Sequence, residues 1–171
     1  MRSLLLSLFL FVSSSVHAME EHHVSGLRFA APSGAEVTRH TLSESVDSVA
    51  VTLNEQGLVF VQYSGSKMPS EKRALKLHLE ELEVRLLKTC LEGSLEVKKD
   101  TMDILGRAKV GRRLKYGKHY AGGERNYIAK LGVRRVRGMT LVVLWTAPVS
   151  EDENYFAPQL LKTLGLTEGK P

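Results

Sequence analysis

Cysteine is nearly missing from this chain, since Cys90 is the only one in 171 residues. No disulfide can therefore form within the chain. Cys90 falls on the apolar side of a helical pattern, and we interpret it as a small core side chain. Aromatic residues are also scarce, at 6% of the chain, with a single tryptophan. The basic strands described below lack the interleaved stacking aromatics of RNA-binding sheets, so we expect no nucleic-acid partner.

Motifs for catalysis and metal binding are missing as well. The segment Gly106–Gly111 spaces two glycines as a phosphate-binding loop does, but Arg112 and Arg113 replace the Lys-Ser/Thr pair that such a loop requires. His78 begins a pattern similar to a zinc-protease helix, but Leu82 stands where the second histidine would bind zinc. We interpret His78 as a helix-surface side chain. We therefore expect no catalytic residue, no metal site, no cofactor and no enzyme activity.

Long apolar runs are confined to the N-terminus. Arg2 precedes the apolar segment Leu4–Val12, and small residues follow at Val16–Ala18. This order is typical of a secretory signal peptide, and the apolar segment is shorter than the ~20 residues that cross a bilayer. We predict a signal peptide over residues 1–18 and a single domain over residues 19–171. The protein is then periplasmic or secreted and is not an integral membrane protein.

The rest of the chain is organised around one amphipathic helix, predicted from Ser70 to about Leu91. Its apolar residues recur at three- and four-residue spacing, which places them on one helix face. The main stripe contains Leu75, Leu79, Leu82, Leu86 and Cys90, and a second row widens it with Leu77, Val84, Leu87 and Leu91. No residue on this helix indicates chemistry, and we interpret it as a scaffold.

Segments with the pattern of strands lie on both sides of this helix. They are expected at Gly26–Ala30, Ala35–Thr41, Asp47–Leu53, Leu58–Tyr63, Ser94–Met102, Arg107–Tyr116, Tyr127–Val136 and Met139–Thr146. The polar segment Glu20–Val24 is not expected to be regular. Two strands, Leu58–Tyr63 and Met139–Thr146, are apolar on both faces, so both sides of the sheet must be covered.

A shorter C-terminal helix supplies the second cover. Ser150 and Glu153 have the spacing of a capping box, and apolar residues follow from Phe156 to Leu164. The fold class predicted is therefore α+β. An antiparallel sheet of about six strands lies between the long helix and this shorter C-terminal helix.

The order of these segments resembles that of a known superfamily. The chain reads GLRFAAPSG, then PSEK at the helix start, then ILGRAKVGRRLKY and VRGMTLVVLWTAP before the last helix. In this order it is similar to the PsbP-like and DcrB-like exported proteins, although it lacks the lipid-attachment cysteine of DcrB-type members. The resemblance implies a small α/β/α sandwich with a non-enzymatic accessory or binding role.

One stretch of the sequence is unusually basic. Between Gly106 and Thr140 there are eleven Lys and Arg residues and one acidic residue, Glu124, although the whole chain has a formal net charge of only +5. The charge is therefore concentrated in this stretch. The predicted binding residues are Arg107, Lys109, Arg112, Arg113, Lys115, Arg134, Arg135 and Arg137.

Two interpretations of the basic stretch stay open. It is either a solvated sheet face whose charges prevent aggregation, or a surface for an anionic protein, a lipid head group or a cell-envelope polymer. The function predicted is an exported, non-enzymatic binding or accessory module of the cell envelope that uses this basic sheet surface. The alternative is a small envelope hydrolase whose active site is assembled from distant residues.

Overall fold

The computed structural model describes residues 18–66, 68–150 and 155–167. Up to the long helix, the elements are β1 (Met19–Val24), β2 (Leu27–Pro32), β3 (Glu36–Ser43), β4 (Val46–Leu53), β5 (Gln56–Tyr63) and α1 (Glu71–Leu87). After it come β6 (Glu96–Ile104), β7 (Arg107–Tyr120), β8 (Gly123–Val136), β9 (Met139–Pro148), α2 (Phe156–Thr163) and β10 (Gly165–Leu166). The predicted signal peptide, apart from Ala18, and the capping-box residue Glu153 lie outside the described residues.

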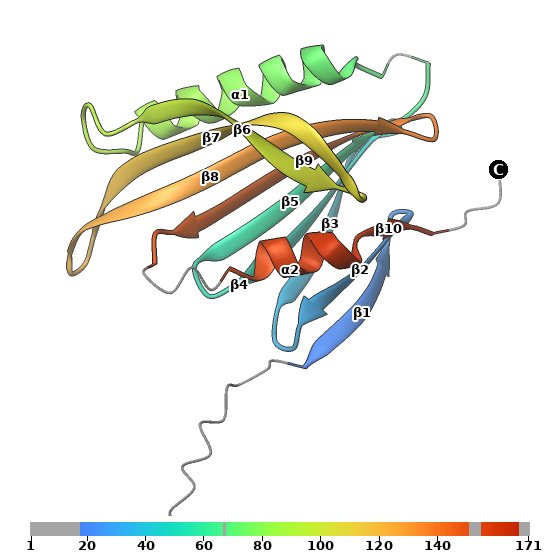
Figure 1. Ribbon diagram of the computed structural model, residues 1–171, viewed down its shortest axis with the longest axis horizontal. Helices are drawn as coiled ribbons and strands as arrows, with labels where there is room; N and C mark the ends of the chain where they lie inside the picture. Colours follow the sequence, from blue (N-terminus) through green and yellow to red (C-terminus); the bar gives the residue numbers. More distant parts are fainter. Residues whose placement is uncertain (1–17, 67, 151–154, 168–171) are drawn as a thin grey trace, which may run out of the picture.

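The strands form two antiparallel sheets. The larger has seven strands in the order β3-β4-β5-β9-β8-β7-β6, and the smaller has three in the order β1-β2-β10. Figure 1 shows α1 on one side of the seven-stranded sheet, and α2 with the three-stranded sheet on the other side. We call these the α1 side and the α2 side of the large sheet.

The predicted fold class is therefore wrong. The large sheet has seven strands rather than about six, and β1, β2 and β10 form a second sheet that was not expected. The segment Glu20–Val24, expected to be irregular, lies in β1. The eight-residue α2 covers only part of its side, and β2 buries Leu27 and Phe29 in the same core. Strands of the three-stranded sheet therefore provide much of the covering layer on this side, which was expected to consist of a helix alone.

The position of the long helix was predicted correctly, but its buried apolar face is narrower than predicted. Ser70 caps its N-terminus by accepting a hydrogen bond from the Arg73 N–H. Leu82 and Leu86 are buried against β7 and β8. The residues expected to widen the stripe include Leu77, Val84 and Leu87, which are 50%, 55% and 66% exposed, and the helix ends at Leu87 rather than near Leu91.

Two glycines allow the end of the β6–β7 hairpin to leave the plane of the sheet. Pairing between β7 and β8 stops at Arg112, whereas β6 and β7 stay paired to the end of β6. A Cβ atom on Gly111 would lie 2.2 Å from the carbonyl oxygen of Leu131, and one on Gly132 would lie 3.0 Å from Ile104 Cδ1. Because neither glycine has a side chain, β6 crosses over β8 on the α2 side (Figure 1).

Candidate functional site

Alternation along β7 divides its side chains between the two sides of the sheet. Leu114 and Tyr116 are buried in the cluster that α1 covers. Arg113 and Lys115 alternate with them and therefore lie on the α2 side. Lys98 of β6 is the register partner of Arg113. Lys98, Arg113 and Lys115 form what we call the basic strip.

The basic strip has an excess of positive charge. Glu96, the register partner of Lys115, has its carboxylate 2.5 Å from Lys98 Nζ. The hydrogen bond with Lys98 lowers the pKa of the Glu96 carboxyl, and the charges of Lys98, Lys115 and Arg113 add to this effect. Within the described part of the chain, Arg113 and Lys115 form no direct ion pair. These two side chains remain available for an anionic group.

Two other predicted binding residues hold the β6–β7 hairpin in place. Lys109 Nζ lies 2.9 Å from Glu71 Oε1 at the start of α1. Arg134 Nη1 donates to the backbone carbonyl groups of Ile104, at 2.6 Å, and of Leu105. Both basic groups are therefore engaged in contacts within the fold.

The remaining four predicted residues are dispersed. Arg107 is exposed at the start of β7, and Arg112 shares the α1 side with the buried residues of that strand. Arg135 and Arg137 are exposed at the end of β8 and in the turn to β9. The eight predicted residues thus do not share one face of the sheet. Only Arg113 and Lys115 gather with Lys98, which the sequence did not single out.

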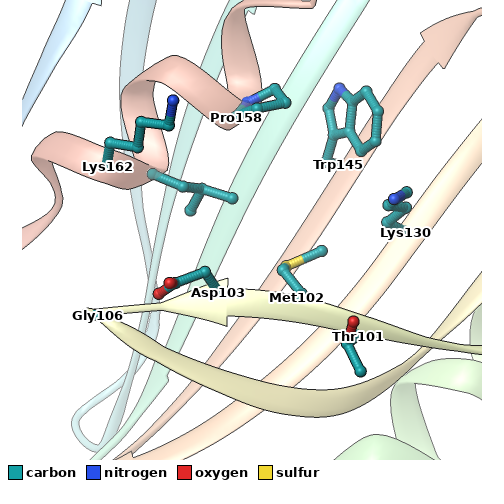
Figure 2. Close-up of a pocket in the computed structure, with 9 residues that line it drawn as sticks. Thr101, Met102, Asp103, Gly106, Lys130, Trp145, Pro158 and Lys162 are labelled. Carbon is teal, nitrogen blue, oxygen red and sulfur yellow. The ribbon is translucent and has the colours of Figure 1, made fainter.

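A cavity opens on the α2 side, between α2 and the end of β6 (Figure 2). Its volume is about 390 Å³, within the ~300–1,000 Å³ range of small-molecule sites. It is lined by Thr101, Met102, Asp103, Gly106, Lys130, Trp145, Pro158, Leu161 and Lys162. Apolar side chains from β6, β9 and α2 thus meet a few charged ones in a single concave site.

Lys130 and Trp145 form one wall of this cavity. Lys130 Nζ lies 5.7 Å from the centroid of the indole ring, and 3.1 Å from Asp100 Oδ2. Burial would raise the pKa of Asp100, but hydrogen bonds from the Thr101 N–H and from Lys130, together with nearby positive charges, lower it. Lys130 is thus held against the face of the indole by an ionised carboxylate.

The indole N–H group of Trp145 is a buried donor without an acceptor. Trp145 is 4% exposed, and within the described residues its Nε1 atom has no hydrogen-bond partner. Figure 2 shows the nitrogen on the side of the ring that faces Pro158 and α2. Leaving such a donor unpaired costs about 1–3 kcal/mol of stability, and a bound hydrogen-bond acceptor would remove this cost.

A second, smaller cavity of about 260 Å³ lies on the α1 side, next to β5. Tyr63 Oη and His78 Nε2 are 2.7 Å apart at its edge, and His78 Nδ1 is 3.9 Å from Glu81 Oε2. Burial lowers the pKa of His78, and the charge of Glu81 opposes this shift only in part. Burial also raises the pKa of Tyr63, and Glu81 adds to that shift.

The sequence placed His78 on the helix surface, and the structure places it against Tyr63 instead. The two residues belong to different elements, and their pairing depends on how α1 docks on the sheet. No spacing rule connects them. In the same way, Trp145 was expected only as part of a doubly apolar strand, and its unpaired N–H group became visible only in the folded chain.

Two further observations limit the kinds of site in the described residues. No group of three or more His, Cys, Asp and Glu side chains among them lies close enough together to hold a metal ion. No helix in this part of the chain is long and apolar enough to cross a membrane.

Comparison with known proteins found similarity in structure alone. No family model matches the chain, and no curated protein matches its sequence. The Ran-binding protein Mog1p of Saccharomyces cerevisiae aligns with a TM-score of 0.49 and 9% identity, covering 88% of this chain and 96% of that chain. LpqN, described as involved in cell envelope biogenesis of Mycobacterium tuberculosis, aligns with a TM-score of 0.40 and 13% identity, covering 89% and 86%. Similarities this weak support no conclusion about function, and the resemblance to PsbP-like and DcrB-like proteins stays a prediction.

Proposed function

We propose that this chain is a non-enzymatic binding protein of the cell envelope, periplasmic or secreted, that recognises an anionic partner through the basic strip. The observation that carries this proposal is the placement of Arg113 and Lys115 on one side of β7, with Lys98 opposite Arg113. The guanidinium group of Arg113 suits a carboxylate or phosphate, because its paired N–H donors match two oxygens of either group.

The test compares two double variants that change the net charge by the same amount. Arg113→Glu with Lys115→Glu reverses the strip, and Lys72→Glu with Arg73→Glu reverses two exposed residues in the first turn of α1, on the other side of the sheet. Negative charge is favourable near a helix N-terminus, so the control is expected to fold well. Lys98 and Lys99 do not offer a control, because Lys98 belongs to the strip.

The binding assay is sedimentation with vesicles that contain phosphatidylglycerol, beside vesicles of phosphatidylcholine alone. Each basic residue near an anionic membrane contributes about 1 kcal/mol, so the strip variant should bind at least roughly thirtyfold more weakly. Binding of the wild type should also weaken with salt, as the screening length falls from about 10 Å at 0.1 M to about 3 Å at 1 M.

A second arm identifies an acidic protein or polymer as the partner instead of a lipid. Immobilised wild type and both double variants are incubated with envelope extract at low and high salt. A partner retained by the wild type and by the α1 control, but lost in the strip variant, supports the proposal. Equal losses in both double variants would show that net charge alone is responsible.

A small hydrolase remains the second candidate, and the Tyr63–His78 pair is the observation that favours it. Burial lowers the pKa of His78, which keeps the imidazole neutral near pH 7, as a general base must be. If this function holds, purified protein should hydrolyse p-nitrophenyl acetate, and His78→Gln should remove that activity. Activity equal in wild type and His78→Gln would exclude His78 as the catalytic base.

A further inference from the structure

We infer that the cavity between α2 and β6 is a binding site for a small amphipathic carboxylate, with an apolar body and one anionic head. This inference goes beyond the proposed function, because it concerns a small molecule inside the fold and uses none of the three residues of the basic strip. It begins from the unpaired N–H group of Trp145, which is buried in the wall of the cavity.

The side chains that line the cavity suit a ligand with an apolar body. Met102, Pro158 and Leu161 line the cavity together with the indole of Trp145. Figure 2 shows Met102 of β6, Pro158 of α2 and Trp145 of β9 around the same space. Met102 and Trp145 are 7% and 4% exposed, so this part of the wall lies deep in the structure. An aliphatic chain or a single ring would replace water there at a gain of roughly 25 cal/mol per Å² of apolar surface.

The position of Lys130 decides which part of the indole a ligand can meet. Its ammonium group lies over one face of the Trp145 ring, and Asp100 holds it there. The rings of Tyr155 and Trp145 meet in a T-shaped arrangement, with centroids 5.0 Å apart. Figure 2 shows the indole nitrogen on the side of the ring that faces Pro158, another lining residue, so the group that a ligand presents there must be a hydrogen-bond acceptor.

The charges around the cavity do not by themselves choose the head group of the ligand. Lys130 and Lys162 both line the cavity, and Asp103 is the one carboxylate among the lining residues. Asp100 is already paired with Lys130. These four charges balance, so the head group is chosen by the unpaired N–H group instead: an ammonium cannot accept its hydrogen bond, and an ionised carboxylate accepts a stronger one than a neutral hydroxyl does.

The experiment uses the single tryptophan as the reporter, because Trp145 is the only indole in the chain. Octanoate, octanol and octylamine are titrated into the protein in separate experiments. Tryptophan fluorescence and the single indole N–H signal in a ¹H–¹⁵N spectrum are followed. We expect a saturable change with octanoate, a downfield shift of the indole proton as it gains an acceptor, and weaker binding of octanol and octylamine.

Three variants test the placement of the ligand, with affinity for octanoate measured by calorimetry. Trp145→Phe removes the donor, and loss of a hydrogen bond of this kind should weaken binding about tenfold. Leu161→Phe adds bulk inside the cavity and should also weaken binding, whereas Leu87→Phe adds the same bulk on the exposed side of α1 and should not. Thermal unfolding of each variant checks that it is folded.

The outcomes separate this inference from the proposed function. The strip variant, Arg113→Glu with Lys115→Glu, should still bind octanoate but should no longer bind anionic vesicles. No saturable change with octanoate in the wild type would overturn the inference, and so would equal affinity for octylamine. Unchanged affinity in a folded Leu161→Phe variant would overturn it as well, because the ligand would then bind elsewhere. None of these results bears on the basic strip.

Discussion

Tyr63 Oη and His78 Nε2 lie 2.7 Å apart, which joins the last residue of β5 to the middle of α1. Their rings meet edge to face with centroids 5.8 Å apart. The contact lies at the side of α1 that borders β5, while the buried stripe of the helix packs on β7 and β8. It therefore helps to set how the helix lies across the sheet.

The first prediction concerns the pH dependence of stability. Burial lowers the pKa of His78 in the folded chain, so the unfolded chain binds a proton that the native state lacks once the pH falls below about 6.5. The contribution of His78 is present above that pH and is lost as the pH falls toward the native pKa. Urea unfolding should therefore show a free energy of unfolding that decreases from pH 7 to pH 5.

His78→Gln should flatten that decrease, whereas His40→Gln, at an exposed position of β3, should leave it unchanged. The carboxylates whose pKa values are lowered, Asp47, Glu71, Glu96 and Asp100, titrate at lower pH and act outside this window. An unchanged slope in His78→Gln would show that another group is responsible.

The second prediction removes the Tyr63 hydroxyl. Tyr63→Phe takes away the partner of His78 Nε2 while keeping the ring, and it should lower the free energy of unfolding by about 0.5–1.5 kcal/mol. Chemical denaturation at pH 7.5, where His78 is neutral in the folded and unfolded states, measures this loss of stability without a contribution from protonation of His78. A loss that persists in a His78→Gln background would contradict the pairing, because the partner is then already gone.

The third prediction distinguishes the buried stripe of α1 from its exposed row. Leu82 is 7% exposed, so Leu82→Ala should cost about 2–5 kcal/mol. Leu87→Ala, at a position that is 66% exposed, should stay within about 0.5 kcal/mol. Similar losses in denaturant unfolding of the two variants would mean that the exposed row is covered in solution.

The fourth prediction concerns the crossing of β6 over β8. A methyl group on Gly111 meets the carbonyl oxygen of Leu131, which belongs to the backbone and cannot rotate away. Gly111→Ala should therefore cost about 1–3 kcal/mol, the usual range for overpacking. Gly122→Ala is the control, because nothing lies within 4 Å of the added carbon. Equal thermal unfolding of the two variants would contradict the close contact at Gly111.

The fifth prediction concerns export, which the described residues do not test. Intact-mass measurement on protein from the periplasmic or secreted fraction should show a chain that begins at Met19. A full-length species that stays in the cytoplasm would contradict the signal peptide inferred from Arg2 and the apolar segment after it.

Local pattern predicted the elements of this protein well. The three- and four-residue spacing in the middle of the chain located α1, and Ser70 was its first residue in the prediction and is its cap in the structure. Alternation placed Arg113 and Lys115 on the opposite side of β7 from Leu114, as the burial of Leu114 confirms. These features repeat every two or every three to four residues, and a single chain segment is enough to show them.

The arrangement of those elements depended on contacts between distant segments. The polar sequence of β1 gave no sign that it would pair with β2, and the three-stranded sheet is held by burial of Leu27 and Phe29 beneath the large sheet. The basic stretch is continuous along the chain, but in the structure its side chains are divided between the two sides of the sheet. Successive side chains of a strand point to opposite sides. In addition, β6 crosses β8 at Gly111 and Gly132.

The amino-acid sequence by itself determined most of the helices and strands, though not β1 or β10, and how a strand divides its side chains between two faces, because these follow from local periodicity. Only the tertiary structure decided which charges stay free, which histidine is partly buried and where a cavity remains. Lys109, Arg134 and Lys130 bind groups 29 to 38 residues away in the chain, and Tyr63 meets His78 across two elements. Such contacts follow from how whole elements pack, and no spacing within one segment encodes them.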